Sequence, residues 1–470
     1  MRYVALCILI SMGLLACTHI PTEPLIGNYP PEISHLISAN CLGGDCHTGA
    51  STANTGLDLT TWDQMTRGSS YFNEVIPFNA VRSHMFGHVN TNPNLGPVFA
   101  PSMPYARDPL SRSDQIAIFN WIIQGAKNAD GKVPYSDITK KLFVVNQEEN
   151  TISVIDAQSQ RLVRVVLNSG GGKPTAITLS GDKKSFFVAD QDPNGTIAKY
   201  DIETYAKQGE FTTKLVCGDV AITKDGAKGY TIDNSYGGKR FVSFDPIGMK
   251  LLSTFSSPLL RQPAAIVIAP VGEIAYICGF GSDNVLRIDT RNDSVMASIP
   301  VGDNVPVPIE PTYIAQYQPR KIVLSSDGKT MYLSCQATSE IVVLDLENDS
   351  ITARIPIQYG PWGEALRPKS SELWVCNYIS NQVSVVGTKT NTVIATIDSV
   401  NNYPRAITFT PDGKYAFVAC ELLTASSGHA HGGDGQPSSA YVVIDCGSRK
   451  IVSTQDLPAL STGIVTAYEE

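Results

Sequence analysis

The repeating unit of this chain is clearest at residues 319–345, which read PRKIVLSSDGKTMYLSCQATSEIVVLD. A proline opens an apolar strand, and the Asp327-Gly328 pair then marks a turn. A second strand carries the aromatic Tyr332, and a third strand ends in Asp345. Short apolar runs separated by turn residues predict β-strands, and a further turn leads to a fourth strand of the same unit.

This unit recurs seven times from about residue 139 onward. The aromatic residues of the second strands are spaced by 44, 43, 46, 56, 42 and 43 positions: Phe143, Phe187, Tyr230, Tyr276, Tyr332, Trp374 and Phe417. A period in the forties with four strands per repeat is typical of a β-propeller. The first unit starts at Lys140 without its first strand, and residues 461–466 fit the missing pattern. We therefore expect seven blades in a ring closed by strands from both ends of the chain.

Two other positions of the unit are regular. The first strand starts with proline in five units and with cysteine in one: Pro174, Cys217, Pro263, Pro319, Pro361 and Pro404. The third strand ends in aspartate in six units, and Gly387 stands there in the seventh. The segments LFVVN at 142–146 and WVCN at 374–377 resemble YVTN-type propellers. This resemblance implies an all-β seven-bladed propeller over 139–470, but a propeller fold does not define a function.

The register of the propeller predicts one binding face. The residue after each first-strand proline is expected at the mouth of the central channel, and three of these residues are Arg320, Trp362 and Arg405. Tyr378 follows a second strand and is expected on the same face. Two arginines among aromatic residues favour a small anion or an acidic patch of a partner. The alternative is that the arginines pair with aspartates of the blades.

The first 17 residues have the pattern of an export signal. Arg2 precedes an apolar stretch over 4–16, which is too short to span a bilayer. The residues LLAC at 14–17 resemble the lipobox of bacterial lipoproteins, which implies a lipid on Cys17 and a lipid-anchored protein of the cell envelope, on the periplasmic or cell-surface side. Proline-rich residues 18–31 are then expected to form a tether. The alternative is a plain secretory signal with an incidental cysteine.

A candidate haem-attachment motif lies at 41–47. Cys41 and Cys46 are followed directly by His47. Covalent haem needs two thiols and an adjacent histidine for the iron, usually as Cys-x-x-Cys-His. Four residues separate the thiols here, so the motif is a wider variant. The alternative is a short disulfide loop followed by an unrelated histidine.

The second axial ligand of such a haem is expected from a loop before a closing helix. Met103 lies in the stretch PSMP at 101–104, and it is the predicted ligand. His84, Met85 and His88 are competitors, with His88 the alternative axial histidine. A methionine ligand would raise the reduction potential relative to two histidines.

A helix is predicted over about 112–126, with Ser111 as its cap and Ile116, Phe119 and Ile123 on one face. Residues 32–130 resemble the small cytochrome c domains common in planctomycetes, through GLDL at 56–59, Met103-Pro104, and WIIQGA at 121–126. The resemblance implies a small all-α cytochrome c domain with one covalent haem c.

Two insertions in the propeller and a group of four cysteines each allow more than one interpretation of their role. The insertions lie at about 302–318 and 423–439, and they are expected on one face of the propeller. The second contains His429 and His431, which indicate either a metal site or a mobile polar loop. Four cysteines near second-strand ends are either copper or disulfide residues or small apolar fillers: Cys278, Cys335, Cys376 and Cys420.

The composition of the chain reduces the number of function classes that it can support. Asp and Glu total 44 against 36 Lys and Arg, and no basic block occurs, so nucleic-acid binding has little support. No Ser-His-Asp arrangement, paired carboxylates or phosphate loop is visible. The favoured function is electron transfer through one haem to a redox partner protein not named by the sequence, with the propeller as docking platform. The first alternative is an oxidoreductase with its own site on the propeller; this combination of domains is similar to that of cytochrome cd1 nitrite reductase. The second alternative is a binding or adhesion protein.

Overall fold

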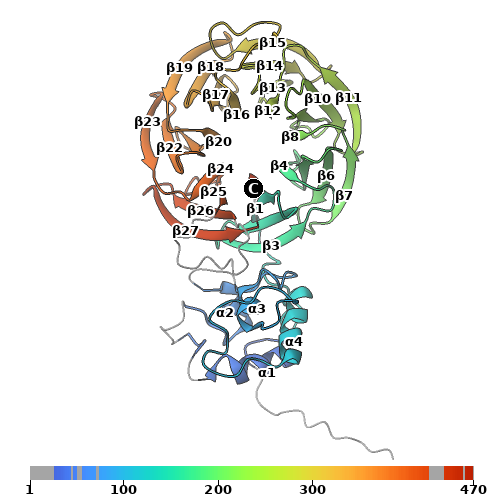
Figure 1. The fold of residues 1–470 in the computed structure, drawn as a ribbon, viewed down its shortest axis with the longest axis vertical. Coiled ribbons are helices and arrows are strands. Elements are labelled where there is room, and N and C mark those ends of the chain that lie inside the picture. Colours follow the sequence, from blue (N-terminus) through green and yellow to red (C-terminus); the bar gives the residue numbers. More distant parts are fainter. Residues whose placement is uncertain are drawn as a thin grey trace, which may run out of the picture.

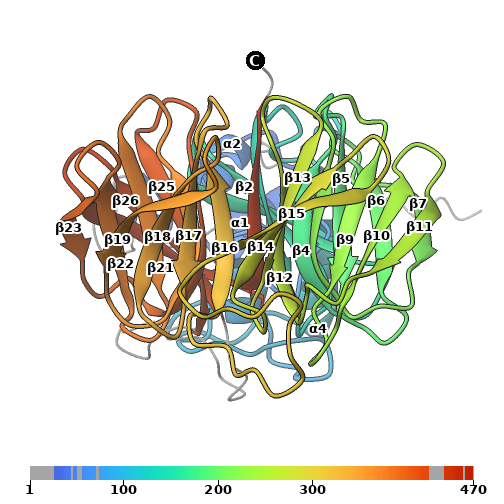
Figure 2. The same ribbon diagram turned by 90° about the horizontal axis from the view of Figure 1, so that it is seen from above.

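The computed structural model describes residues 26–43, 46–49, 56–69, 74–422, 439–458 and 461–468. These residues form four helices followed by 28 strands. The strands make a ring of blades around a central channel, and the N-terminal segment lies beside the rim (Figure 1). Figure 2 shows the same ring from above, with the strands of each blade running roughly along the channel.

The described strands form seven four-stranded antiparallel sheets, which confirms the predicted seven-bladed propeller. From inner to outer strand, the first three blades are β28 (Ser461–Tyr468), β1 (Lys140–Asn146), β2 (Thr151–Asp156) and β3 (Arg161–Leu167); β4 (Pro174–Leu179), β5 (Ser185–Asp190), β6 (Thr196–Asp201) and β7 (Lys207–Thr212); and β8 (Cys217–Ile222), β9 (Gly229–Asp233), β10 (Arg240–Asp245) and β11 (Lys250–Ser256).

The other four blades follow the same order. They are β12 (Pro263–Ile268), β13 (Ile274–Gly279), β14 (Asn284–Asp289) and β15 (Ser294–Pro300); β16 (Pro319–Leu324), β17 (Thr330–Cys335), β18 (Glu340–Asp345) and β19 (Ser350–Pro356); β20 (Pro361–Leu366), β21 (Glu372–Asn377), β22 (Gln382–Gly387) and β23 (Thr392–Ile397); and β24 (Asn402–Phe409), β25 (Tyr415–Leu422), β26 (Ser439–Asp445) and β27 (Lys450–Leu457).

The C-terminal strand closes the ring as predicted. β28 pairs with β1, with Phe143 opposite Val465. Second and third strands are buried on both faces between neighbouring blades, so they are almost continuously apolar, as in β17. Outer strands such as β19 alternate between exposed and half-buried positions, because one face meets solvent.

The aspartate that ends most third strands caps the following turn. The carboxylate of Asp245 accepts hydrogen bonds from the amides of Ile247 and Gly248, both at 2.9 Å. Such a side chain satisfies amides that the tight turn leaves without strand partners. At the exceptional Gly387 the backbone carbonyl takes over, accepting the Thr390 amide at 3.3 Å.

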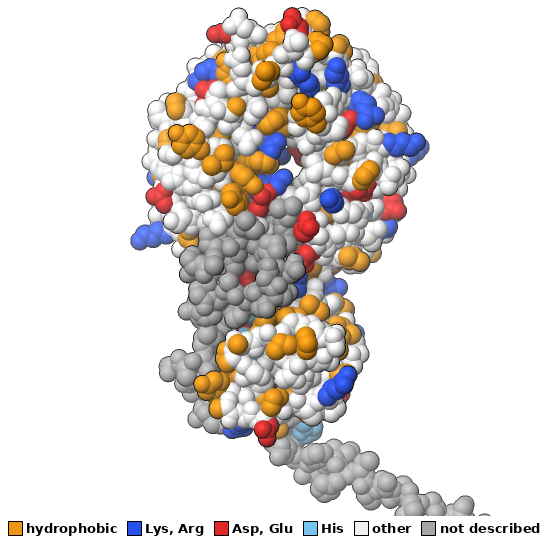
Figure 3. Space-filling view, in the orientation of Figure 1, with side chains coloured by type: hydrophobic (Ala, Val, Ile, Leu, Met, Phe, Trp, Pro, Cys, Tyr) orange, Lys and Arg blue, Asp and Glu red, His pale blue; other side chains and the backbone are white. Residues whose placement is uncertain are grey.

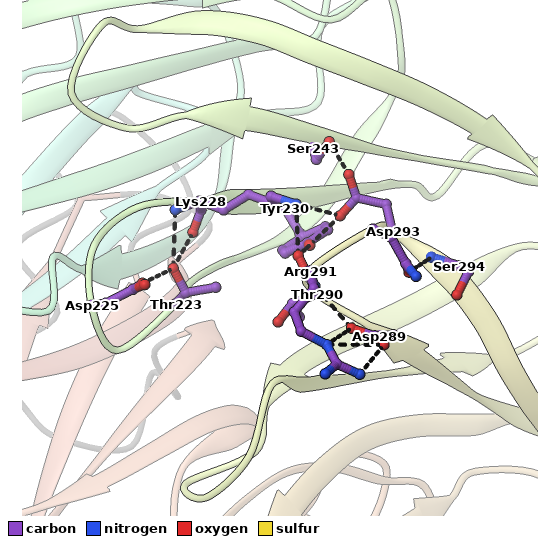
Figure 4. Close-up of polar contacts among 11 residues, drawn as sticks. Thr223, Asp225, Lys228, Tyr230, Ser243, Asp289, Thr290, Arg291, Asp293 and Ser294 are labelled. Carbon is purple, nitrogen blue, oxygen red and sulfur yellow. Dashed lines mark hydrogen bonds and ion pairs between the residues drawn. The ribbon is translucent and has the colours of Figure 1, made fainter.

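A second aspartate links neighbouring blades (Figure 4). Asp293, in the turn between β14 and β15, accepts a hydrogen bond from Lys228 at 2.9 Å and another from the Tyr230 hydroxyl, both from β9 or its preceding turn. Ser243 of β10 donates to the other oxygen of Asp293 at 3.0 Å. These contacts join the third and fourth blades by half-buried and buried polar groups as well as by apolar packing.

The N-terminal segment contains α1 (Pro31–Asn40), α2 (Trp62–Arg67), α3 (His84–Val89) and α4 (Arg112–Ile123). The predicted start of the last helix is correct, since the Ser111 hydroxyl accepts the Asp114 amide at 3.2 Å. The predicted face is wrong: Ile116 and Ile123 are exposed. The core of this segment instead buries Ile118, Trp121 and Ile122 of α4.

The expectation of a separate, small all-α cytochrome c domain is wrong. The described part of the segment has only four helices, of 10, 6, 6 and 12 residues, joined by turns and loops. The segment is also not separate, because Ile76 belongs to an apolar cluster of the first and last blades. Arg164 of β3 stacks 3.6 Å from the Phe78 ring, and Arg82 forms an ion pair with Glu149. The sequence motifs therefore predicted a helical domain where the structure has a loop-rich segment that packs against the propeller.

In the residues that the structure describes, no helix is long and apolar enough to cross a membrane.

Candidate functional site

Two free thiols lie at the end of the first helix. Cys41 is the C-terminal cap of α1, and its amide donates to the Ile37 carbonyl at 2.8 Å. Cys41 is half-buried and Cys46 is exposed, and neither forms a disulfide. Burial and, to a lesser extent, the nearby Cys46 raise the pKa of the Cys41 thiol to about 12. A Cβ at Gly43 would lie 3.1 Å from an Arg107 guanidinium nitrogen, so the missing side chain lets this arginine approach the loop.

His47 follows the second thiol and is tied to the chain at Leu59. The carbonyl of His47 accepts the Leu59 amide at 2.9 Å. Its Nδ1 atom is buried and has no hydrogen-bond partner. Burial lowers the pKa of the imidazole, a backbone contact with Leu57 opposes this, and the neighbouring His88 lowers the pKa further. The ring is therefore neutral at pH 7, which is the form that ligates metals.

The two leading candidates for the second axial ligand lie side by side. The Met103 amide donates to the His88 carbonyl at 2.8 Å, and Nδ1 of His88 lies 2.9 Å from the Pro101 carbonyl oxygen. Met103 is partly buried against the apolar cluster of the segment. Of the other competitors, Met85 is buried in that cluster, and the His84 ring lies 6.5 Å from that of His88.

The inner strands of the propeller surround a channel of about 170 Å³. One residue from each blade lines its mouth, at the position after the first-strand proline or its equivalent: Thr175, Gly218, Ala264, Arg320, Trp362, Arg405 and Thr462. The three large residues come from the adjacent strands β16, β20 and β24, so the mouth is lopsided. Figure 3 shows basic and hydrophobic side chains gathered beside the central opening.

Trp362 and two arginines form the large side of the mouth. The guanidinium carbon of Arg320 lies 3.5 Å from the centroid of the Trp362 ring and 4.9 Å from that of Phe280. The guanidinium carbon of Arg405 lies 4.7 Å from the Trp362 ring. Burial lowers the pKa of each arginine to about 10, and Arg405 adds to this effect on Arg320. Both remain protonated at neutral pH, held by cation–π contacts.

The two arginines differ in their pairing. Arg405 forms an ion pair with Glu421, and the Tyr378 hydroxyl donates to the same carboxylate at 2.5 Å. Tyr378 also packs against Trp362, with ring centroids 4.7 Å apart and the rings tilted by 33°. The Nε atom of Arg320 is buried without a hydrogen-bond partner, and no ion pair of Arg320 occurs among the described residues. The expected alternative of pairing within the blades therefore holds for Arg405, although with a glutamate instead of an aspartate, and it does not hold for Arg320 among the described residues.

Charged residues also line the channel below its mouth. Lys321 lies 3.2 Å from the carboxylate of Asp219 across the channel. Glu364 is only 5% exposed, and neither of its oxygens has a hydrogen bond of normal geometry. Burial raises the pKa of Glu364 to about 8, although the Ser334 backbone and the Lys321 ammonium act against it. At neutral pH the Glu364 side chain is therefore mainly a neutral carboxylic acid.

The sequence analysis missed Glu364, although a signal was present. Glu364 is the third residue after its strand-one proline. The equivalent position is aliphatic in the other blades: Ile177, Val220, Ile266, Ile322, Ile407 and Ile464. An acidic residue at a position that is otherwise apolar indicates a buried carboxyl group, and such groups are concentrated at functional sites.

The first insertion lies on the channel-mouth face, as expected. The carboxylate of Asp283, in the loop between β13 and β14, accepts the Tyr313 hydroxyl at 2.8 Å and the Gln318 amide at 2.8 Å. Arg261 donates to the Tyr313 carbonyl at 2.7 Å. The insertion at 302–318 is thus anchored to the loops around the mouth.

The four second-strand cysteines are buried and free: Cys278, Cys335, Cys376 and Cys420. They belong to apolar clusters between blades, where they pack as small apolar fillers. Among the described residues, no group of three or more His, Cys, Asp or Glu side chains is arranged to hold a metal. His429, His431 and Cys17 lie outside the described residues.

Solved structures with similar folds exist. Hydrazine synthase of Kuenenia stuttgartiensis is 18% identical, with a TM-score of 0.51 over 60% of this chain and 89% of that chain. A functionally unknown protein from Desulfotomaculum acetoxidans is 13% identical, with a TM-score of 0.57 over 71% of this chain and all (100%) of that chain. At these identities the likeness concerns the fold alone. No curated protein matches this chain.

A family model described as the choice-of-anchor I domain matches residues 132–367. This match is half of the chain and covers the propeller from before β1 to the end of β20. A family of this description indicates a surface-associated or extracellular protein. The chain belongs to the choice-of-anchor I domain family.

Proposed function

We propose that this protein carries one covalently attached haem c on its N-terminal segment and transfers single electrons at the cell surface. The observation that carries the proposal is the group formed by Cys41, Cys46 and His47. Both thiols are free, and the adjacent imidazole has a buried nitrogen without a partner. Two further candidate iron ligands, His88 and Met103, are joined by a backbone hydrogen bond.

These residues fit the chemical needs of haem c. Cys41 and Cys46 would form the two thioether bonds, and His47 would ligate the iron as a neutral imidazole. Haem iron supplies reversible one-electron chemistry when bound. The second ligand would tune the reduction potential: Met103 would favour a high potential, and His88 a lower one. Met103 is our assignment for the second ligand.

The propeller would act as a docking platform for a redox partner protein. The N-terminal segment packs against β3 and the loop that follows β1, so the two parts are held together. We also propose that a lipid on Cys17 anchors the protein to a membrane of the cell envelope, in keeping with the surface-associated family. One acyl-bearing cysteine with its attached chains suffices for such an anchor.

Mass spectrometry tests the haem directly. Full-length protein made in a bacterial host with haem-ligation machinery should show the mass of one haem adduct, resistant to acidified organic solvent. The double variant Cys41→Ala, Cys46→Ala should lose the adduct, whereas the control Cys446→Ala should keep it. An unmodified wild-type mass, or haem that the solvent extracts, would show that no thioether bonds form.

A second candidate is an oxidoreductase with its own substrate site on the propeller face. The observation that favours it is the set of buried polar atoms without a partner on two residues that line the channel, Nε of Arg320 and both carboxyl oxygens of Glu364. Turnover of a substrate by the purified protein, lost on replacement of either residue, would favour this function over simple electron transfer.

A further inference from the structure

We propose that the mouth of the central channel binds a small organic carboxylate, with the carboxylate group on Arg320 and the far end of the molecule on Glu364. The proposal goes beyond electron transfer and does not depend on haem. It rests on two side chains that line the same channel and hold buried polar atoms without a hydrogen-bond partner: the half-buried Arg320, through its Nε atom, and the buried Glu364, through both carboxyl oxygens.

The charges around the channel favour a ligand with negative charge. Arg405 is neutralised by Glu421, and Lys321 by Asp219. Arg320 retains an uncompensated positive charge, because it has no ion pair in the part of the chain that the structure describes. The buried Nε atom of this half-buried guanidinium lacks an acceptor, and a bound carboxylate would supply the missing partner in a bidentate geometry.

The shape of the mouth favours a small molecule. Trp362 and Phe280 flank the Arg320 guanidinium, which restrains its plane. Small residues such as Gly218 and Ala264 from other blades leave the rest of the mouth open. Along a strand, two residues span about 6 to 7 Å, so Glu364 lies roughly that far below Trp362 on β20. A carboxylic acid of a few carbon atoms is long enough to reach both polar groups within about 170 Å³.

Both oxygens of Glu364 are buried in the channel wall, so its carboxyl group would turn toward the channel to recognise an oxygen atom at the far end of the ligand. Burial raises the pKa of this residue to about 8, so at neutral pH its carboxyl group can donate a hydrogen bond to a hydroxyl or carbonyl oxygen. The ionisable groups around it are Lys321 and the thiols of Cys335 and Cys376. Burial raises the pKa of both thiols well above the usual value, so they stay neutral. Above pH 8, ionised Glu364 would repel an anionic ligand.

Calorimetric titration of the full chain tests the site. The probes are acetate, lactate and succinate, with acetamide, lactamide and succinamide as neutral analogues, and sulfate and phosphate as inorganic anions. We expect a carboxylate to bind with a stoichiometry of one molecule per chain. The amides and the inorganic anions should bind at least about tenfold more weakly than that carboxylate. If no carboxylate binds, or if sulfate binds as well as the best carboxylate, the assignment is overturned.

Variants connect binding to the two residues. R320Q should lower the affinity for the carboxylate that binds best by about tenfold or more, because a charged hydrogen bond to the ligand is lost. R320K should recover part of the affinity if folding is intact. The matched control R291Q removes an exposed arginine that pairs with Asp289 far from the channel lining, and it should bind as wild type. Unchanged affinity in R320Q, or equal loss in R291Q, would overturn the site.

The pH profile tests the role of Glu364 separately. Wild-type affinity should fall between pH 7 and pH 9, and E364Q should bind at pH 7 without this fall. If E364Q keeps the wild-type pH profile, Glu364 does not contact the ligand. Melting temperatures of all variants show whether the fold is retained, and wild-type-like melting makes each loss of binding attributable to the site.

Discussion

The backbone amide of Met103 donates a hydrogen bond of 2.8 Å to the carbonyl of His88. The two candidate axial ligands are therefore neighbours in space, although 14 residues lie between them in the sequence. His88 is in α3, and Met103 is in the loop before α4. His88 is also close enough to His47 to lower the pKa of that imidazole. Sequence spacing favours Met103, and the electrostatic effect on His47 makes His88 the competing ligand.

We predict that Met103→Ala removes the weak red charge-transfer band of methionine-ligated ferric haem and lowers the reduction potential. The reason is that loss of the thioether leaves the site to water or to His88, which stabilise ferric iron better. Absorption spectra and a redox titration measure both effects. His88→Ala is the matched variant and should retain the band. The opposite result would assign the ligand to His88.

Cys17→Ala should move the protein from the membrane fraction to the soluble fraction. The physical reason is that the acyl chains on this cysteine would supply the apolar surface that holds the protein at the bilayer. Fractionation followed by immunodetection measures the distribution, and Cys446→Ala serves as the control. Equal partitioning of wild type and Cys17→Ala would contradict the lipid anchor.

Asp283→Ala should release the insertion at 302–318. The buried Asp283 carboxylate accepts hydrogen bonds from three backbone amides of the insertion and from the Tyr313 hydroxyl. Loss of this acceptor leaves several donors unpaired, so we expect a stability decrease of about 2 to 3 kcal/mol and faster proteolysis within the insertion. The exposed Asp303 lies in the same segment, and Asp303→Ala should change neither property. Urea unfolding and limited proteolysis decide the outcome.

Glu74 should make the stability of the protein depend on pH. Burial raises the pKa of its side chain from 4.5 to about 7, while a hydrogen bond from Ser69 and the charge of Arg161 act against this. Because the folded state holds the proton more tightly, the stabilisation is fully present below pH 4.5 and is lost as the pH rises through 7, by about 3 kcal/mol in all.

The variant Glu74→Gln should abolish this loss between pH 5 and pH 8, because the amide carries no titrating proton. The exposed Glu148 provides the control, and Glu148→Gln should retain the wild-type pH dependence. Urea unfolding at pH 5, 6, 7 and 8 measures the effect. A Glu74→Gln profile as steep as that of wild type would assign the pH dependence to other groups.

The propeller was predictable from sequence because its determinants are local and repeated. Phe143 and its six equivalents mark buried second strands, and aspartates such as Asp245 cap turns within a few residues of themselves. The pairing of β28 with β1 also followed, since a unit without its first strand needs a partner strand to close the ring. The position of Arg320 and Trp362 at the channel mouth depends only on this register.

Only the tertiary structure could decide the pairing of side chains between blades and the packing of the N-terminal segment. Glu421 of β25 neutralises Arg405 of the paired strand β24 in the same blade, and Arg320 has no ion pair in the described residues. Lys321 of β16 instead pairs with Asp219 of β8, a strand of another blade that lies about a hundred residues earlier in the chain. Helical periodicity grouped Ile116 with Phe119 and Ile123 on one face, but α1 and α3 pack against the other side of α4, so Ile118 is the buried residue and Ile116 is exposed. Periodicity reports which residues share a face, whereas burial of that face depends on neighbours that only the folded chain brings together.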